Sequence, residues 1–162
     1  NALEAGVKYG VKVYFGLEWL LAGGCNDYLL YGASPSFLER YPNIPALSLP
    51  QFKEIADRHH LLVIQAHPFR PGIKQDTIEF VHGYEVYNGA RGNEGSRNDL
   101  ALAYWREQGG IALSGSDCHQ LHQVGKGGII TKYLPEDEAS LAELMRKDDF
   151  QLIADPEFQS WL

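Results

Sequence analysis

Short runs of β-branched, aromatic and aliphatic residues alternate along the chain with stretches whose apolar residues recur at helical spacing. The short runs predict strands at residues 11–15, 27–32, 61–66, 84–88, 111–114, 128–131 and 150–153. The amphipathic stretches predict helices over residues 48–59, 98–108 and 135–147. Strands that alternate with helices at this spacing indicate parallel βα units. We therefore expect a single α/β domain over residues 1–162, with mostly parallel strands.

Side chains that can bind a metal ion follow several of the predicted strands. Glu18 comes soon after the first strand, His67 directly follows the third, and Asp117 and His119 follow the fifth. The carboxyl ends of parallel strands in a barrel meet on one face, where the active sites of such folds are built. Asp117 and His119 should also point together, because alternate residues of an extended segment share a face. Carboxylates combined with imidazoles favour Zn²⁺, Mn²⁺ or Fe²⁺ as the bound cation.

Each of these residues also has a simpler interpretation. Asp117 is equally typical of a helix N-cap beside an unrelated histidine. Glu18, taken alone, is typical of an exposed loop acid, and a single buried histidine such as His67 is usually a hydrogen-bonded core residue. The metal interpretation is favoured because such residues recur at the ends of separate strands, all of which should face the same region.

Four further residues are candidates for binding a substrate. Arg70 follows His67 closely, and Arg91 lies in a loop rich in Gly, Asn and Arg. A guanidinium group can hold a phosphate group through two parallel hydrogen bonds, although an ordinary surface position is an equally good interpretation of either arginine. Glu85 and Asn88 lie within or just past the fourth predicted strand, toward the same face as the metal candidates.

The composition narrows the possible partners. The formal net charge of −7 argues against a surface that grips long nucleic acid, which needs a cationic track. A small phosphorylated substrate is compatible with this charge, because bound metal ions supply positive charge locally. The chain contains no apolar run long enough to span a bilayer and no start typical of a signal peptide, so the expected compartment is the cytoplasm, without membrane contact. Two cysteines are too few for a disulfide framework.

Five motifs resemble, in the same order, those of the PHP (polymerase and histidinol phosphatase) family of metal-dependent phosphoesterases. They are GLEW at residues 16–19, NDYLLYG at 26–32, AHPFRPG at 66–72, EVYNG at 85–89 and GSDCH at 115–119. The resemblance implies a distorted seven-stranded βα barrel, a site for two or three divalent metal ions, and hydrolysis of phosphate esters. It further implies that Glu18 bridges two metals, while His67, Asp117 and His119 are terminal ligands.

The chain departs from the family pattern before Glu18. The His-x-His pair, the Asp and the further His of the family's first motifs should precede this residue, yet only 17 residues do, and none is His or Asp. We therefore expect an incomplete barrel that carries part of the metal site, with partial metal occupancy and weak or no activity in isolation. Exposed strand edges should favour self-association or docking of the missing N-terminal segment. The alternative is a catalytically inactive PHP-like module with a binding or structural role.

Overall fold

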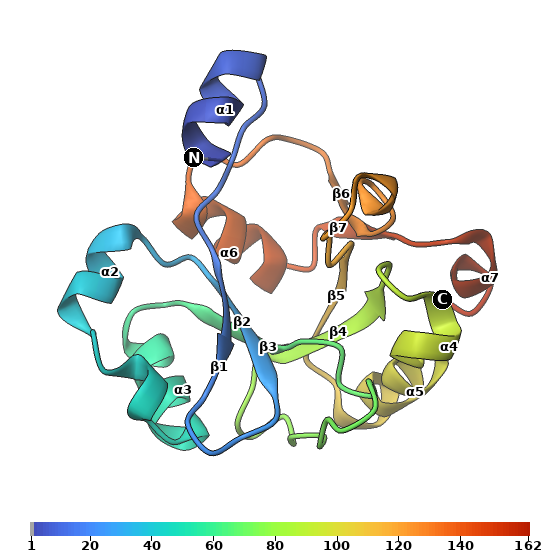
Figure 1. Cartoon of the computed structure of the whole chain (residues 1–162), viewed down its shortest axis with the longest axis horizontal. Helices are drawn as coiled ribbons and strands as arrows, with labels where there is room; N and C mark the ends of the chain where they lie inside the picture. The colour runs from blue at the N-terminus through green and yellow to red at the C-terminus, as the bar shows by residue number, and fades with distance from the viewer. Residues whose placement is uncertain (1) are drawn as a thin grey trace.

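The central element of the fold is a five-stranded mixed sheet with strand order β1-β2-β3-β4-β5 (Figure 1). The computed structural model describes residues 2–162, with only the backbone described at positions 92 and 93. The strands of the central sheet are β1 Leu17–Leu20, β2 Asp27–Tyr31, β3 Leu62–Gln65, β4 Gly83–Asn88 and β5 Ile111–Gly115. A second sheet pairs β6 Gly128–Thr131 with β7 Phe150–Ile153.

Helices connect these strands. They are α1 Ala2–Tyr9, α2 Pro35–Arg40, α3 Leu49–Arg58, α4 Gly92–Ser96, α5 Asn98–Gln108, α6 Glu138–Arg146 and α7 Pro156–Gln159, with 3₁₀ turns at Ile44–Ala46 and Leu121–Gln123. The predicted helix over 48–59 is confirmed as α3, where the Gln51 side chain accepts a hydrogen bond from the Ser48 backbone N–H at 3.0 Å and closes a capping box. The helix predicted to begin at residue 135 begins at Glu138, because Asp137 caps it by accepting a hydrogen bond from the Ser140 N–H at 2.7 Å.

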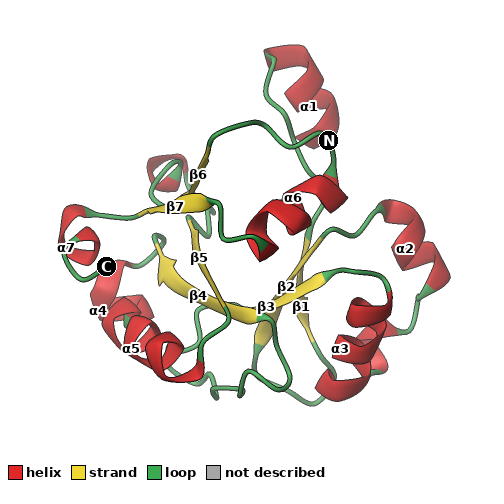
Figure 2. Cartoon of the chain, turned by 180° about the vertical axis from the view of Figure 1, so that it is seen from behind, coloured by secondary structure: helices red, strands yellow, loops and turns green. Residues whose placement is uncertain are grey.

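The strand directions confirm a mixed α/β fold with a mostly parallel sheet. β1, β3, β4 and β5 run in the same direction, and β2 runs in the opposite direction between β1 and β3. β6 and β7 form an antiparallel pair. Over the residues described, the sheet does not close into a barrel (Figure 2). Among the described residues, the predicted parallel pairing is therefore found from β3 to β5, and within it only the β4–β5 connection contains helices, α4 and α5.

The strand predicted at residues 11–15 is wrong. This segment has the composition of a strand but pairs with no other strand among the described residues. Two of its hydrogen bonds go instead to the start of α6 and the chain just before it: Tyr14 Oη donates to the Pro135 carbonyl at 2.6 Å, and the Phe15 N–H donates to the side chain of Glu138, the first residue of α6, at 2.9 Å. The first strand begins only at Leu17, so Glu18 lies within β1 rather than beyond its end.

Apolar side chains from the helices cover both faces of the central sheet. On one face, Phe52 of α3 and Leu102 of α5 pack with Val63 of β3 and with β4. The opposite face packs against α6, which lies across the sheet from α3 and α5 (Figure 2). Leu62 and Ile64 of β3 contact that helix, and the same strand then leads directly into His67. The apolar layer beneath α6 thus gives way to polar side chains at the carboxyl end of β3.

No helix in residues 2–162 has the length and apolarity that a bilayer span requires.

His82 connects α3 to the sheet and should make stability depend on pH. Its Nδ1 accepts a hydrogen bond from the Val63 N–H at 2.9 Å, so its Nε2–H donates to Asp57 Oδ1, 2.7 Å away. Burial lowers the pKa of His82 below its ordinary value of 6.5, although the hydrogen bond to Asp57 opposes this shift. The folded state therefore prefers the neutral ring, and its contribution to stability is present above about pH 6.5 and lost as the pH falls below it.

We expect His82→Ala to lower the free energy of unfolding at pH 7.5 by about 2 kcal/mol, because the Val63 N–H loses its acceptor. His82→Gln keeps one acceptor and one donor and should retain much of this stability while losing the added pH dependence below about pH 6.5. Urea unfolding at several pH values measures both effects, with the exposed His122→Gln as the matched control. An equal pH dependence in wild type and His82→Gln would contradict this role.

Candidate metal centre and its polar surroundings

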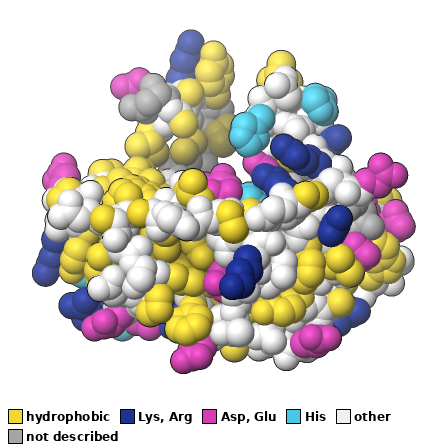
Figure 3. Space-filling model, turned by 60° about the horizontal axis from the view of Figure 1, so that its bottom comes forward, with side chains coloured by type: hydrophobic (Ala, Val, Ile, Leu, Met, Phe, Trp, Pro, Cys, Tyr) yellow, Lys and Arg dark blue, Asp and Glu magenta, His cyan; other side chains and the backbone are white. Residues whose placement is uncertain are grey.

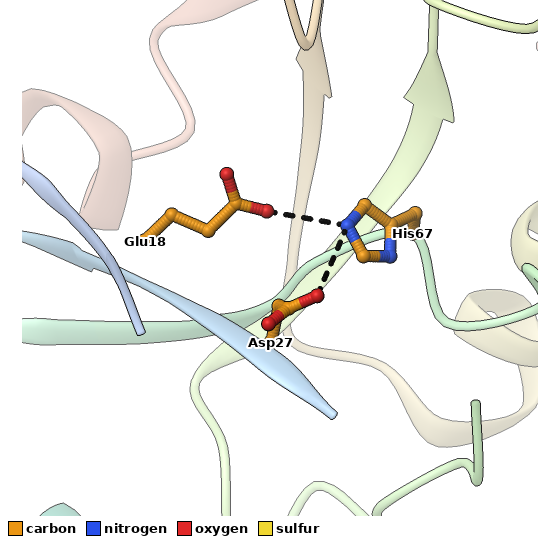
Figure 4. Close-up of side chains that lie close together, drawn as sticks. All are labelled: Glu18, Asp27 and His67. Carbon is orange, nitrogen blue, oxygen red and sulfur yellow. Dashed lines mark hydrogen bonds and ion pairs between the residues drawn. The ribbon is translucent and has the colours of Figure 1, made fainter. Parts of the chain in front are cut away.

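Three potential metal ligands from three different segments meet at one end of the sheet. They are Glu18 of β1, Asp27 at the start of β2 and His67 just after β3, and we call them the acid–histidine cluster (Figure 4). His67 Nε2 lies 3.2 Å from Glu18 Oε1 and 3.7 Å from Asp27 Oδ2. One ligand atom from each residue lies within 4.8 Å of the others.

The register of the sheet brings these residues together. In the β1–β2 pair, Leu20 lies opposite Asp27 and Glu18 lies opposite Leu29. Paired residues share a face of the sheet and alternate residues repeat it, so Glu18 and Asp27 project to the same side. On the other edge of β2, the Ala66 N–H donates to the Asp27 carbonyl at 2.9 Å, which places Asp27 beside the end of β3, one residue before His67.

Burial differs across the cluster. His67 is only 2% exposed, whereas the side chains of Glu18 and Asp27 are 44% and 32% exposed. The imidazole therefore forms the base of the cluster and the carboxylates form its solvent-facing rim. Two carboxylates that approach one nitrogen repel each other, and a divalent cation between them would remove that repulsion. Two carboxylates and one imidazole are also a donor set suited to Zn²⁺, Mn²⁺ or Fe²⁺, so the residues fit such a cation.

The backbone at this site adopts an uncommon conformation. His67 has φ of +30° and Asp117 has φ of +45°, in the left-handed region that costs a non-glycine residue about 1–2 kcal/mol. The His67 N–H is held by Glu85 Oε2 at 2.9 Å, and its buried Nδ1 has no hydrogen-bond partner among the described residues. Strain of this kind concentrates at functional sites, where the surrounding structure holds it in place.

A second group, which we call the arginine network, adjoins the cluster and consists of Arg70, Glu85, Asn88 and Asp117. Asp117 Oδ2 accepts hydrogen bonds from Arg70 Nη2 and, at 3.1 Å, from Asn88 Nδ2. Asn88 Nδ2 also donates to Glu85 Oε2 at 3.1 Å. Because Glu85 Oε2 accepts the His67 N–H as well, the network and the acid–histidine cluster are directly connected.

The pKa values of the two carboxylates in the network are shifted in opposite directions. Burial raises the pKa of Glu85, against the hydrogen bonds from Asn88 and the His67 N–H. Burial also acts to raise the pKa of Asp117, but hydrogen bonds from Arg70 and Asn88 outweigh it and leave that pKa below its ordinary value. Asp117 is thus ionised at neutral pH, and the positive charge of Arg70 already balances its negative charge. Burial likewise raises the pKa of Tyr31, with the charges of Glu85 and Glu18 adding to the effect.

Gly115 has a clear structural role beside Glu85. A Cβ atom at this position would lie 2.3 Å from Glu85 Oε1, so any side chain would displace the carboxylate. The glycine that opens the last motif is therefore required by the close approach of Glu85 to the backbone of β5.

The residues singled out in the sequence divide between these groups. Glu18 and His67 belong to the acid–histidine cluster, whereas Asp117 lies in the arginine network. Asp117 and His119 do come together, with His119 Nδ1 3.2 Å from Asp117 Oδ1, although the left-handed backbone at Asp117 replaces the extended segment on which that prediction rested. The His119 side chain is 73% exposed and is not part of the cluster. Arg91 is exposed and lines a separate hollow.

Sequence reasoning missed Asp27. The predicted ligands all lie near the carboxyl ends of strands, whereas Asp27 is the first residue of its strand. Because β2 is antiparallel to its neighbours, its beginning lies where theirs end. A search for acids at both ends of every predicted strand would have found it.

Comparisons with known proteins identify a fold but no family. No family model matches the sequence, and no curated protein matches it either. The structure resembles the crystal structure of PsfC from Pseudomonas syringae PB-5123, with a TM-score of 0.69 and 17% sequence identity. The match covers 91% of this chain and 62% of PsfC, so the chain spans about three-fifths of the length of that protein. At this identity the likeness shows a shared fold.

We expect Asp27→Asn to weaken Mn²⁺ or Zn²⁺ binding by at least about tenfold, because the amide is neutral and lacks the negative charge that attracts the cation. Isothermal titration calorimetry on metal-depleted protein measures the affinity. Asp149→Asn is the matched control, because Asp149 pairs with Lys132 on the surface, away from the cluster. Wild-type affinity in Asp27→Asn, together with lost affinity in His119→Gln, would place the metal elsewhere.

Removing the cation of the arginine network should raise the pKa of Asp117. Burial raises the pKa of Asp117, and the hydrogen bond from Arg70 is the largest effect that lowers it. Arg70→Gln removes that effect, so the Asp117 carboxylate should titrate at higher pH in a carbon-13 NMR titration of metal-free protein. A depressed carboxyl pKa stabilises the folded state above the ordinary value of 3.8, and this contribution is lost as the pH falls through the folded pKa. Arg70→Gln should therefore cost about 2 kcal/mol at pH 7 and less near pH 3. A cost independent of pH would contradict this assignment.

Proposed function

We propose that this chain carries part of the metal site of a PHP-type phosphoesterase, which hydrolyses phosphate esters of a small metabolite or nucleotide. The single observation that carries the proposal is the convergence of Glu18, Asp27 and His67, whose ligand atoms come from three separate segments and lie within 4.8 Å of one another. The motif resemblance supplies the reaction class, and the shared α/β fold is compatible with it.

Each residue of the site would have a defined task. Glu18, Asp27 and His67 would hold a divalent cation, which when bound polarises the phosphoryl group and lowers the pKa of water. Arg70 would contact the phosphate group, because its guanidinium already faces the ligand-rich end of the sheet and its buried Nε has no hydrogen-bond partner among the described residues. Asp117 would hold Arg70 in position.

In this proposal His119 would transfer a proton. Its Nδ1 lies 2.9 Å from the Asp117 carbonyl, which leaves Nε2 of an exposed ring for the leaving alcohol. Because it stands outside the acid–histidine cluster, its role in proton transfer is distinct from the terminal-ligand role that the resemblance implies for it.

A second candidate function, a catalytically inactive binding module, is favoured by one specific observation. Arg70 already neutralises Asp117, so one expected metal ligand is engaged by a side chain rather than directed at a cation. In such a module the cluster would bind a metal or an anionic ligand without turning it over.

The two functions are separated by assaying phosphate release from a panel of phosphate monoesters in the presence of Mn²⁺ or Zn²⁺. We expect slow, metal-dependent release that a chelator abolishes and that falls at least about tenfold in Asp27→Asn and in His67→Gln. Asp149→Asn, on the surface, should keep the wild-type rate.

Phosphate release that persists at the full rate with chelator would overturn the proposal. Metal binding by calorimetry without release from any ester in the panel would favour the inactive module.

A further inference from the structure

A hollow of about 530 Å³ lies beside the arginine network and takes no part in the metal site. Its walls are two glycine-containing loops, one directly after β4 and one directly before β6, together with the segment between β7 and α7. Its lining includes Tyr87, Gly89, Arg91, Lys126, Ile153 and Asp155.

The two loops form one packed unit. Gly89 lies so close to the second loop that a Cβ on it would come within 2.8 Å of Lys126 Cβ and of its carbonyl oxygen. Gln123 Nε2 donates to the Ala90 carbonyl at 3.2 Å, and the Gly89 N–H donates to the Gly115 carbonyl at 2.9 Å. These contacts hold the Arg91 loop and the Lys126 loop against each other at the end of β5.

The hollow has a net positive charge in an acidic protein. Arg91 and Lys126 are both exposed, and neither forms an ion pair with any side chain that the structure describes. The one acid in the lining, Asp155, is already hydrogen-bonded: Oδ1 accepts the Phe158 N–H at 2.8 Å and Oδ2 accepts Tyr87 Oη at 3.1 Å. Figure 3 shows Lys and Arg side chains gathered beside His side chains on one projection of the molecule.

We propose that Arg91 and Lys126 bind a second anionic group of the substrate, a phosphate or a carboxylate remote from the ester that reacts. This assignment rests on the proposed function. The hollow is well placed for it, because Gly89 directly follows Asn88, whose side chain is bonded to Asp117. A molecule with one phosphate at Arg70 and a second anionic group between the two loops would lie across the end of β4. The substrate class is therefore a small metabolite with two anionic groups, such as a diphosphate or a phosphorylated acid.

Calorimetric titration of the metal-free chain with pyrophosphate, in the presence of EDTA, tests the inference without depending on metal binding or turnover. Arg91→Gln and Lys126→Gln should each weaken binding about tenfold, because each removes one charge-assisted contact. Lys132→Gln is the matched control: it removes an exposed cation that is paired with Asp149 and does not line the hollow. Both test positions are exposed, so the variants should fold, which circular dichroism verifies.

A parallel titration with a dicarboxylate distinguishes the two sources of negative charge. Binding of either ligand that depends on Arg91 and Lys126 but not on Lys132 would support the inference, and the tighter ligand would name the anionic group. Equal affinities in wild type, Arg91→Gln and Lys126→Gln, or an equal loss in Lys132→Gln, would overturn it. Failure of the proposed function would show separately, as phosphate release that persists at the full rate with chelator alongside intact anion binding.

Discussion

The reversed strand β2 is the constraint on which the rest of the site depends. Its backbone pairs with β1 on one side and β3 on the other, and its direction places its first residue where both neighbours end. Asp27 consequently lies beside His67, and Glu18 projects from β1 on the same face of the sheet. In a fully parallel sheet, the first residue of β2 would lie at the opposite edge and the carboxylate pair could not form.

The acid–histidine cluster and the arginine network lie side by side at this end of the sheet but differ in how their negative charge is balanced. The acid–histidine cluster combines two partly exposed carboxylates with one buried imidazole, and its unbalanced negative charge suits a cation. In the arginine network, the guanidinium of Arg70 supplies that positive charge to Asp117. Glu85 joins the two groups by accepting hydrogen bonds from the His67 backbone and from Asn88, while α6 covers the adjoining apolar half of the face.

Much of the fold follows from local patterns that the sequence displays. The strands at 128–131 and 150–153 and the helix at 98–108 lie where periodicity predicts them, because burial and local propensity agree there. Residues 11–15 show the limit of that reasoning: a strand requires a partner strand, and this segment instead forms hydrogen bonds with the start of α6 and the chain just before it. Pairing direction is equally non-local, which is why the reversal of β2 was not foreseen.

The candidate site was predictable to a similar extent. Glu18 and His67 were found because polar residues near strand ends stand out in an apolar pattern. Asp27 was missed because its position depends on strand direction. The ion pair of Asp117 with Arg70 joins residues 47 positions apart, and only the folded arrangement reveals which cation that carboxylate contacts. The described sheet is open, and the incomplete PHP-type barrel that the resemblance implies stays a prediction.

The most direct measurement is an anomalous difference map from crystals grown with Mn²⁺ or Zn²⁺ and recorded at the absorption edge of that metal. We expect the strongest peak between the carboxylates of Glu18 and Asp27 and Nε2 of His67, at about 2.0–2.2 Å from each ligand atom for zinc. A map with no peak there, or with a peak only at Asp117 and His119, would contradict the assignment of the acid–histidine cluster as the metal site.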